Sequence, residues 1–382
     1  MAIDDRLQKH LASVLKEVEV SQGGFGGAVA VARRGELVAQ AHFGEASPGR
    51  QWTDHTAALT WSVSKGVCAM IVAKLADDGF NVDKPICNVW PEFSANGKAD
   101  ITLAEVMTHH SGLPWFPDLG FSPSLDYPGS FGRQTDIASA LAKAPPISQY
   151  RGKVAYQAFT YGWIIGEIVR RLKGISLSDF FREEICRPLS LNMGFNIRSI
   201  PSEIELAKPG TPLCAWEEVG NIDSVFADQS SPVRRALMVP AGMKFETVLK
   251  VTEQNEFLEV ECPAISLISS ATSLARIYSH FAAAHFVSPS IRDFFTQERR
   301  YGHDMITDSP RRMALGFALN AEPSMVFNSS PTVFGHPGFG GSLAFGDANG
   351  GLGFAYVTNA MIPSTEIDSR ASRLSQALIE NE

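Results

Sequence analysis

A serine and a lysine spaced three residues apart are the side chains in this sequence that most directly suggest chemistry. Ser62 and Lys65 stand at the start of a long apolar stretch, in the segment WSVSKG. Helical residues at this spacing share one face, and a serine at a helix start lies near the positive end of the dipole and near free backbone N–H groups. A partly desolvated lysine can take up a serine proton. The pair therefore predicts a nucleophilic serine with a basic partner.

The spacing alone leaves a second interpretation open. The same pattern occurs at Ser13 and Lys16, in a charged amphipathic segment where the lysine is expected to be solvated. For Ser62 and Lys65 the structural interpretation is a serine that caps a helix and a lysine whose ammonium group reaches water. Context elsewhere in the chain must decide between the two.

The elements that must position these residues follow from the hydrophobic pattern and the turn residues. Hairpins are expected around Arg34-Gly35 and around Asn349-Gly350. The apolar residues from Thr60 onward predict a helix that ends at Gly79. Strand patterns thus lie near both ends of the chain.

Helical patterns fill much of the remaining chain. Helices are expected in 100–115, where Ser111-Gly112 breaks the pattern, in 159–174 and in 364–379. The proline-studded residues 196–262 match no clear pattern, and long segments of this kind often line binding sites.

This order of elements predicts an α/β (α+β) fold. The simplest arrangement is one antiparallel sheet built from both chain ends and flanked by the terminal helices, with a helical domain inserted. We expect residues 1–100 and 263–382 to form the α/β domain and residues 101–262 to form a mainly helical domain with irregular loops. A cleft between the two domains is the expected place for a site.

Four motifs in order carry a resemblance to a known family. They are WSVSKG, ITLAEVMTHHSGLPW, AYQAFTYGWIIGEIVRR and FGHPGFGGSLAFGDANGGLGFAYVTN. Together they resemble the serine β-lactamase and penicillin-binding protein superfamily, and within it class C β-lactamases and family VIII carboxylesterases, over roughly residues 25 to 361. The resemblance implies a β-lactamase-like fold and an acyl-enzyme mechanism.

The resemblance also implies roles for residues far from the serine. Tyr156 matches the tyrosine that acts, held by the lysine, as the general base. The backbone N–H groups of Ser62 and Phe339 match the two oxyanion donors. The catalytic set implied is therefore Ser62, Lys65 and Tyr156.

Departures from the family pattern bear on the substrate. Ala158 stands where β-lactamases carry asparagine, and His336 stands where they carry the lysine that grips a substrate carboxylate. A largely neutral imidazole grips anions poorly at pH 7, whereas an ester without a carboxylate would not need that contact. Gly338 permits close backbone approach. His336, Gly338, Gln157 and Trp115 are the substrate-binding candidates, and composition suggests that Trp115, Phe116 and Phe121 line an apolar acyl pocket.

Composition and cysteine usage limit the remaining classes of function. Of the 382 residues 45% are hydrophobic, the net charge is −8, and no Lys/Arg cluster suggests nucleic-acid binding. The five cysteines form no C-x-x-C pair, and the neighbouring His109 and His110 fit no zinc pattern. The amphipathic first twenty residues resemble no signal peptide, and no stretch is long enough to cross a membrane. We expect a cytoplasmic protein without metal or organic cofactor.

These observations predict a serine carboxylesterase that cleaves small or short-chain acyl esters through an acyl-serine intermediate. Its partner is then a small-molecule ester, not a membrane or a nucleic acid. Two alternatives stay open. One is a β-lactamase or a D-amino-acid peptidase or amidase on the same fold, and the other is a non-catalytic protein that keeps the fold for binding or assembly.

Overall fold

The architecture is seen in a computed structural model that describes residues 3–20, 23, 25–116, 122–323, 325–364 and 366–380. An eight-stranded sheet, with every neighbouring pair antiparallel, forms the centre of the molecule in the order β2-β1-β14-β13-β12-β11-β10-β9. Its strands are β1 Gly27–Arg33, β2 Glu36–Phe43, β9 Arg300–Asp304, β10 Ser309–Met313, β11 Ala318–Leu319, β12 Val333–Pro337, β13 Leu343–Asp347 and β14 Leu352–Thr358. The sheet joins both chain ends through the pairing of β1 with β14, as the sequence predicts.

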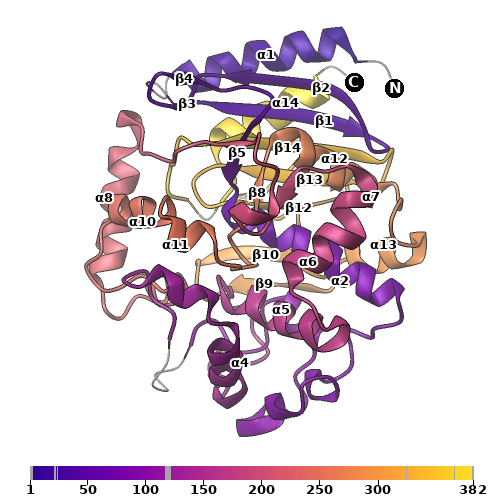
Figure 1. Cartoon of the computed structure of the whole chain (residues 1–382), viewed down its shortest axis with the longest axis vertical. Helices are drawn as coiled ribbons and strands as arrows, with labels where there is room; N and C mark the ends of the chain where they lie inside the picture. Colours follow the sequence, from indigo (N-terminus) through magenta and orange to yellow (C-terminus); the bar gives the residue numbers. More distant parts are fainter. Residues whose placement is uncertain are drawn as a thin grey trace.

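Helices cover both faces of this sheet (Figure 1). The terminal helices α1 (Asp5–Val20) and α14 (Ser369–Ile379) pack together over one face, where they meet Val29 and Val31 of β1. The helix α12 (Ala271–Ala282) packs on the other face. Because the sheet is covered on both sides, every residue of β12, β13 and β14 is buried, including the polar His336 and Asp347.

Both predicted hairpin turns are present. Arg34 and Gly35 join β1 to β2 with φ angles of 50° and 83°, the left-handed pair that a two-residue hairpin turn requires. Asn349 and Gly350 lie in the connection between β13 and β14, and Gly350 has φ 88°. The first turn pairs the edge strand β2 with β1, and the second pairs β13 with β14.

Short strands and one helix carry the chain from the sheet to the site. β5 (Thr56–Leu59) lies in a small sheet of order β6-β8-β5-β7, a 3₁₀ turn at Trp61–Val63 follows it, and α2 (Ser64–Asp77) begins directly afterwards. The remaining short strands are β3 Glu45–Ser47, β4 Arg50–Gln51, β6 Met193–Gly194, β7 Glu205–Leu206 and β8 Ile268–Ser269. The predicted helix from Thr60 is therefore a 3₁₀ turn joined to an α-helix.

The middle of the chain is mainly helical and lies beside and below the sheet in Figure 1. Its α-helices are α3 Leu103–Met107, α4 Gln134–Lys143, α5 Thr160–Lys173, α6 Leu177–Phe181, α7 Arg187–Leu189, α8 Trp216–Ala227, α9 Pro232–Ala236, α10 Phe245–Thr252 and α11 Asn255–Leu258, with α13 Pro289–Thr296 following later. The helices α8 to α11 fall in the segment 196–262, which the sequence left unassigned. The C-terminal helix begins at Ser369, after an Asp368 cap, five residues later than predicted.

Candidate active site

The predicted nucleophile lies on a strained and well-anchored turn. Ser62 is the middle residue of the 3₁₀ turn between β5 and α2, and Trp61 before it has φ 50°, a left-handed value that is costly for a bulky residue. The turn is tied down on both sides: Thr60 N and Oγ1 donate to Leu267 O at 2.8 and 3.0 Å, and Leu267 N donates to Ser64 Oγ at 3.0 Å. These bonds hold the chain on either side of Ser62.

The lysine partner lies one turn further on and is fully buried. Lys65 Nζ donates to Ser62 Oγ at 3.1 Å, to Ala158 O at 2.9 Å and to Ala264 O at 3.2 Å. An ammonium group has three hydrogens, so these contacts satisfy it completely. Lys65 has no exposed surface, and the structure therefore excludes the interpretation in which it extends to water.

The tyrosine of the middle segment reaches the same hydroxyl. Tyr156 Oη donates to Ser62 Oγ at 2.8 Å, and Lys65 Nζ lies 4.8 Å from the centre of the Tyr156 ring. The Tyr156 backbone N–H donates to Asp304 Oδ1 at 3.0 Å, and the ring of His109 packs edge-on at 4.8 Å. Three side chains distant in sequence thus meet at one hydroxyl, with the tyrosine held from both sides.

The end of β12 forms the third wall of the site. His336 is buried on this strand, with its Nδ1 2.7 Å from Pro337 O and its ring 6.3 Å from that of Tyr156. Burial first, and then the charge of Lys65, lower the pKa of His336 to about 3, so the imidazole is neutral at pH 7. A Cβ at Gly338 would lie 2.4 Å from Thr60 O, so only glycine lets this strand end approach the serine turn.

The oxyanion candidate Phe339 follows Gly338 in the connection between β12 and β13. Its ring packs against Trp61 at 5.7 Å and against Phe245 at 5.7 Å, both edge-on. These contacts bring the residue beside the turn that carries Ser62. The two backbone groups implied as oxyanion donors therefore come from neighbouring segments.

The prediction that Gln157 contacts substrate is wrong. Its side chain is fully buried, Oε1 accepts from Ser111 Oγ at 2.8 Å, and Nε2 donates to Thr160 Oγ1 at 3.2 Å. Because Tyr156 points into the site, the next side chain points the other way. Gln157 holds the segment before α5 to the segment after α3.

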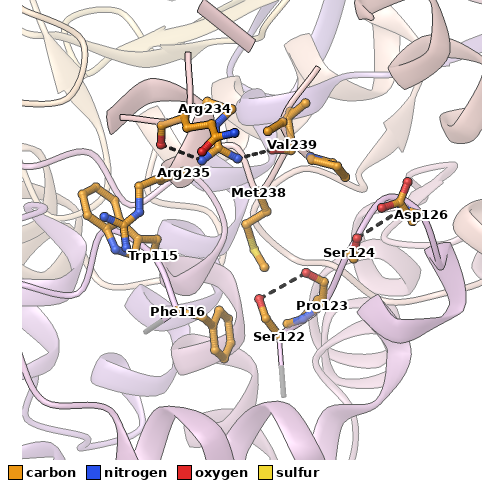
Figure 2. Close-up of a pocket in the computed structure, with 13 residues that line it drawn as sticks. Trp115, Phe116, Ser122, Pro123, Ser124, Asp126, Arg234, Arg235, Met238 and Val239 are labelled. Carbon is orange, nitrogen blue, oxygen red and sulfur yellow. Dashed lines mark hydrogen bonds between the residues drawn. The ribbon is translucent and has the colours of Figure 1, made fainter. Parts of the chain in front are cut away.

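Trp115 and Phe116 line a different cavity from the one that holds Ser62. This outer pocket has a volume of about 580 Å³ and lies between residues 115–116 and 122–126 on one side and 229–241 on the other. Figure 2 shows Trp115 beside Arg235, whose guanidinium lies 4.5 Å from the ring, with Ser124 and Asp126 on the opposite side. The predicted acyl pocket of these two residues is therefore misplaced, and Phe121 lies outside the described residues.

Two small cavities adjoin the serine, and the sequence pointed to about half of the residues that line the first and to few of those that line the second. One, of about 40 Å³, is bounded by Ser62, Tyr156, His336, Gly338, Phe339 and also by Leu237, Arg311, Pro337 and Ser364. The other, of about 30 Å³, is almost wholly apolar and is bounded by Ser62, Trp61, Leu125, Ala158, Phe159, Phe226, Leu237, Val239, Val248, Thr252, Phe257, Ile265 and Phe339. Many of these come from the unassigned segment, whose only signal was its position between motifs.

No metal cluster is found in the part of the chain that the structure describes, since no three His, Cys, Asp or Glu side chains gather there. His109 is buried, which lowers its pKa well below the usual value, and its Nδ1 accepts from Gln157 N at 3.2 Å. The Nδ1 atom of His110 lies 2.6 Å from Thr108 Oγ1. His109 thus packs against Tyr156, whereas His110 contacts Thr108 and Glu105. Among the described helices, none has the length and apolar character needed to cross a bilayer.

Comparison with known proteins agrees with this geometry. A family model described as Beta-lactamase matches residues 3–378. The chain belongs to the Beta-lactamase family. It is 28% identical over 356 residues, 88% of this chain and 77% of the relative, to "Esterase/beta-lactamase LipL" from Mycobacterium tuberculosis strain ATCC 25618 / H37Rv.

Solved structures of the Beta-lactamase fold match the chain over its whole length. A penicillin-binding protein homologue from Caulobacter crescentus has a TM-score of 0.83 at 26% identity, with 100% of this chain and 99% of that one covered. A family VIII carboxylesterase has a TM-score of 0.82 at 22% identity and the same coverage. The predicted fold class is confirmed, and the chain is a serine hydrolase of the β-lactamase fold.

Proposed function

We propose that the protein is a carboxylesterase that cleaves small acyl esters through an acyl-Ser62 intermediate. The observation that carries the proposal is the meeting of Lys65 Nζ and Tyr156 Oη at Ser62 Oγ, at 3.1 and 2.8 Å. A hydroxyl becomes a nucleophile when an adjacent group accepts its proton as it attacks. Both candidate groups are within hydrogen-bond reach of that proton.

In the acylation step Tyr156 acts as a phenolate, so the hydrogen bond between the two oxygens is reversed and Ser62 becomes the donor. Ser62 Oγ attacks the ester carbonyl carbon while its proton passes to that phenolate. The Lys65 ammonium group beside the ring stabilises that phenolate. The carbonyl oxygen becomes an oxyanion held by the backbone N–H groups of Ser62 and Phe339. Collapse of this intermediate breaks the C–O bond, and Tyr156 returns the proton to the departing alcohol.

Deacylation reverses the roles of the same groups. The alcohol leaves, water enters, and Tyr156 takes a proton from the water as its oxygen attacks the acyl carbon. The second tetrahedral intermediate uses the same two N–H donors. When it collapses, the proton returns to Ser62 Oγ and the carboxylic acid departs.

The choice of esters over lactams and amides rests on two side chains at the site. Ala158 presents only a backbone carbonyl, already used by Lys65, and has no side-chain amide to bind a substrate amide. His336 stays neutral, because burial holds its pKa at about 3, and so offers no charge to a substrate carboxylate. Both features favour a substrate that is neutral near the scissile bond.

The size of the acyl group is inferred from the apolar cavity beside Ser62. It measures about 30 Å³, and its walls include Phe226, Val248 and Phe257. Because this cavity is small and is walled by aromatic and branched side chains, it favours acetyl to butyryl groups over longer chains. We also propose that the chain is a family VIII carboxylesterase, a group of which one member shares its fold at full length.

An assay series tests the proposal. p-Nitrophenyl acetate, butyrate and octanoate are compared with nitrocefin and with a D-phenylalanine amide, using purified wild type and Ser62→Ala. We expect acetate and butyrate to give the highest kcat/KM, and the alanine variant to lose that activity. Fast nitrocefin or amide turnover with negligible ester cleavage would contradict the proposal and favour the alternative activities. Absence of every activity would favour a binding protein.

A β-lactamase activity is the second candidate because the LipL relative carries both activities in its name. A carboxylesterase and a β-lactamase are distinguished by the ratio of kcat/KM for nitrocefin to kcat/KM for p-nitrophenyl butyrate. We expect a ratio well below one.

We also propose a cytoplasmic location. Cys68, Cys186 and Cys262 are buried in the structure as thiols that form no disulfide. Free thiols persist in reducing compartments. Fractionation of cells that express the full chain, with a periplasmic and a cytoplasmic marker enzyme, tests this proposal.

A further inference from the structure

We propose that Arg370, fixed by Asp368, is a positioning residue that holds the loop carrying Phe339 so that its backbone N–H is aimed at the oxyanion. The inference rests on the proposed esterase function, because the direction of this N–H matters only if it stabilises a tetrahedral intermediate. Neither residue touches Ser62, so neither is catalytic in its own right.

The loop between β12 and β13 needs an external restraint. Its residues include Gly338, Gly340 and Gly341, and the last two have φ angles of 93° and 124°. Glycine reaches these angles without steric cost but also leaves the chain many other conformations. An oxyanion donor is effective only when it is held to a fraction of an ångström. Within the loop the Phe339 ring is anchored by side-chain packing, against Trp61 and Phe245, but the glycines that flank it have no side chains and need a restraint from outside.

Arg370 supplies a restraint from beneath the loop. Its Nη2 donates to Gly340 O at 3.1 Å and to Ala360 O at 2.9 Å, and the N–H of Ile362 donates to the same Gly340 oxygen at 3.2 Å. A Cβ at Gly341 would lie 2.4 Å from Nη2. The guanidinium thus occupies the space that Gly341 leaves. It also links Gly340, the residue after Phe339, to Ala360, which follows β14.

Asp368 fixes the arginine in turn. Its Oδ1 accepts from Nε at 2.9 Å, and its Oδ2 accepts from Nη2 at 2.9 Å, so the pair is bidentate. Oδ1 also accepts from the Arg370 backbone N–H at 2.7 Å, at the start of α14. The two side chains are only 4% and 3% exposed. A buried pair with several bonds has one geometry, and that geometry is passed to Gly340.

Arg370→Lys is the first test, because it keeps the charge and loses the planar fork. With p-nitrophenyl butyrate we expect kcat to fall about ten-fold or more while KM stays within about two-fold. An alkyl boronic acid that forms a tetrahedral adduct on the serine should lose affinity by the same factor, because it fills the oxyanion position. The matched control is Arg373→Lys on the same helix, whose partner Glu380 lies at the surface, and it should change neither value.

A second variant separates positioning from folding. Asp368→Asn keeps the shape of the side chain and one cap acceptor but weakens the hydrogen bonds to Arg370. We therefore expect a smaller fall in kcat than for Arg370→Lys, again with KM little changed. All rates are divided by the concentration of active sites titrated with a phosphonate, and near-UV circular dichroism reports the fold. Wild-type kcat and boronic acid affinity in both variants, or a loss that disappears after this correction, would overturn the inference.

Failure of the proposed function gives a different result. It would appear as wild-type protein that hydrolyses no ester and forms no phosphonate adduct at Ser62, before any variant at position 370 is made. The positioning role would fall with it. An active, labelled wild type with an unaffected Arg370→Lys variant would instead reject the positioning role alone.

Discussion

At the scale of single residues, Lys65 separates a nucleophile motif from a chance spacing. Its three hydrogens all have acceptors, one of them Ser62 Oγ, and no part of the side chain reaches water. At Ser13 the same spacing lies on α1, and Lys16 at the other end of it is exposed. Burying an ammonium group is costly unless hydrogen bonds compensate for it. The pair of Ser62 and Lys65 therefore has the environment that the proposed chemistry needs, and the pair of Ser13 and Lys16 does not.

The proposed general base is the phenol oxygen of Tyr156, and Tyr156→Phe removes that atom alone. We expect kcat for p-nitrophenyl butyrate to fall about 10²- to 10⁴-fold, the usual contribution of a positioned acid–base group, with KM little changed. Steady-state kinetics checks this expectation. The control is Tyr161→Phe, which loses a 3.0 Å bond to Lys65 O but no contact to Ser62. Equal losses in the two variants would argue against the role.

The neutral His336 predicts a pH dependence of stability. Its folded-state pKa of about 3 lies below the ordinary 6.5, so the unfolded chain binds the proton more readily and stability falls as the pH drops below 6.5. At pH 5 this one group should lower the free energy of unfolding by about 2 kcal/mol relative to pH 7.5. Urea unfolding of wild type and His336→Gln at both values measures the difference. An unchanged pH slope in the variant would contradict it.

At the scale of elements, the sequence predicted what local patterns control. Glycine readily adopts the positive φ angles found at Gly35 and Gly350, so both turns were recognisable from the sequence. The apolar pattern from Thr60 marked the helix that carries Lys65. The α8–α11 helices were missed because they are short, from 4 to 12 residues, and are held by tertiary packing. Gln157 was misassigned for a similar reason, since no sequence pattern tells which of two neighbouring side chains faces a cleft.

The close approach of β12 to the serine turn predicts a severe effect for Gly338→Ala. The new Cβ would lie 2.4 Å from Thr60 O, so the strand end and the oxyanion loop must move apart. We expect kcat to fall at least about ten-fold, because a displacement near 1 Å at a reacting centre is costly. Gly220→Ala is the matched control on α8, where a Cβ meets nothing within 4 Å. Steady-state kinetics on both variants decides, and near-wild-type kcat in Gly338→Ala would contradict the geometry.

At the scale of the whole molecule, the site lies where the sheet meets the helical segment. The division into 1–100 with 263–382 and 101–262 stays a prediction, which limited proteolysis can test. Leu237 borders both small cavities, whereas Val239 borders the apolar cavity on one side and the 580 Å³ outer pocket on the other. A single short segment therefore separates the proposed acyl pocket from a much larger space.

This arrangement predicts that Val239→Ala changes the preferred chain length. A shorter side chain at position 239 should open the apolar cavity beside Ser62 toward the outer pocket. We therefore expect the ratio of kcat/KM for octanoate to that for acetate to rise about ten-fold, which is the effect of a few buried methylene groups. The control is Val225→Ala on α8, which borders none of these cavities. A chain-length series of p-nitrophenyl esters measures the ratio. An unchanged ratio would show that Val239 does not limit the length of the acyl group.

The most direct test of the account is the mass of the covalent intermediate and the residue that carries it. The intact protein is treated with a fluorophosphonate, its mass is measured, and the modified peptide is sequenced. We predict one adduct per chain on Ser62, with none on the neighbouring buried Ser64 and a strongly reduced labelling rate in Tyr156→Phe. An adduct on a different serine, or no adduct on a folded wild-type chain, would contradict the assignment of Ser62 as the nucleophile.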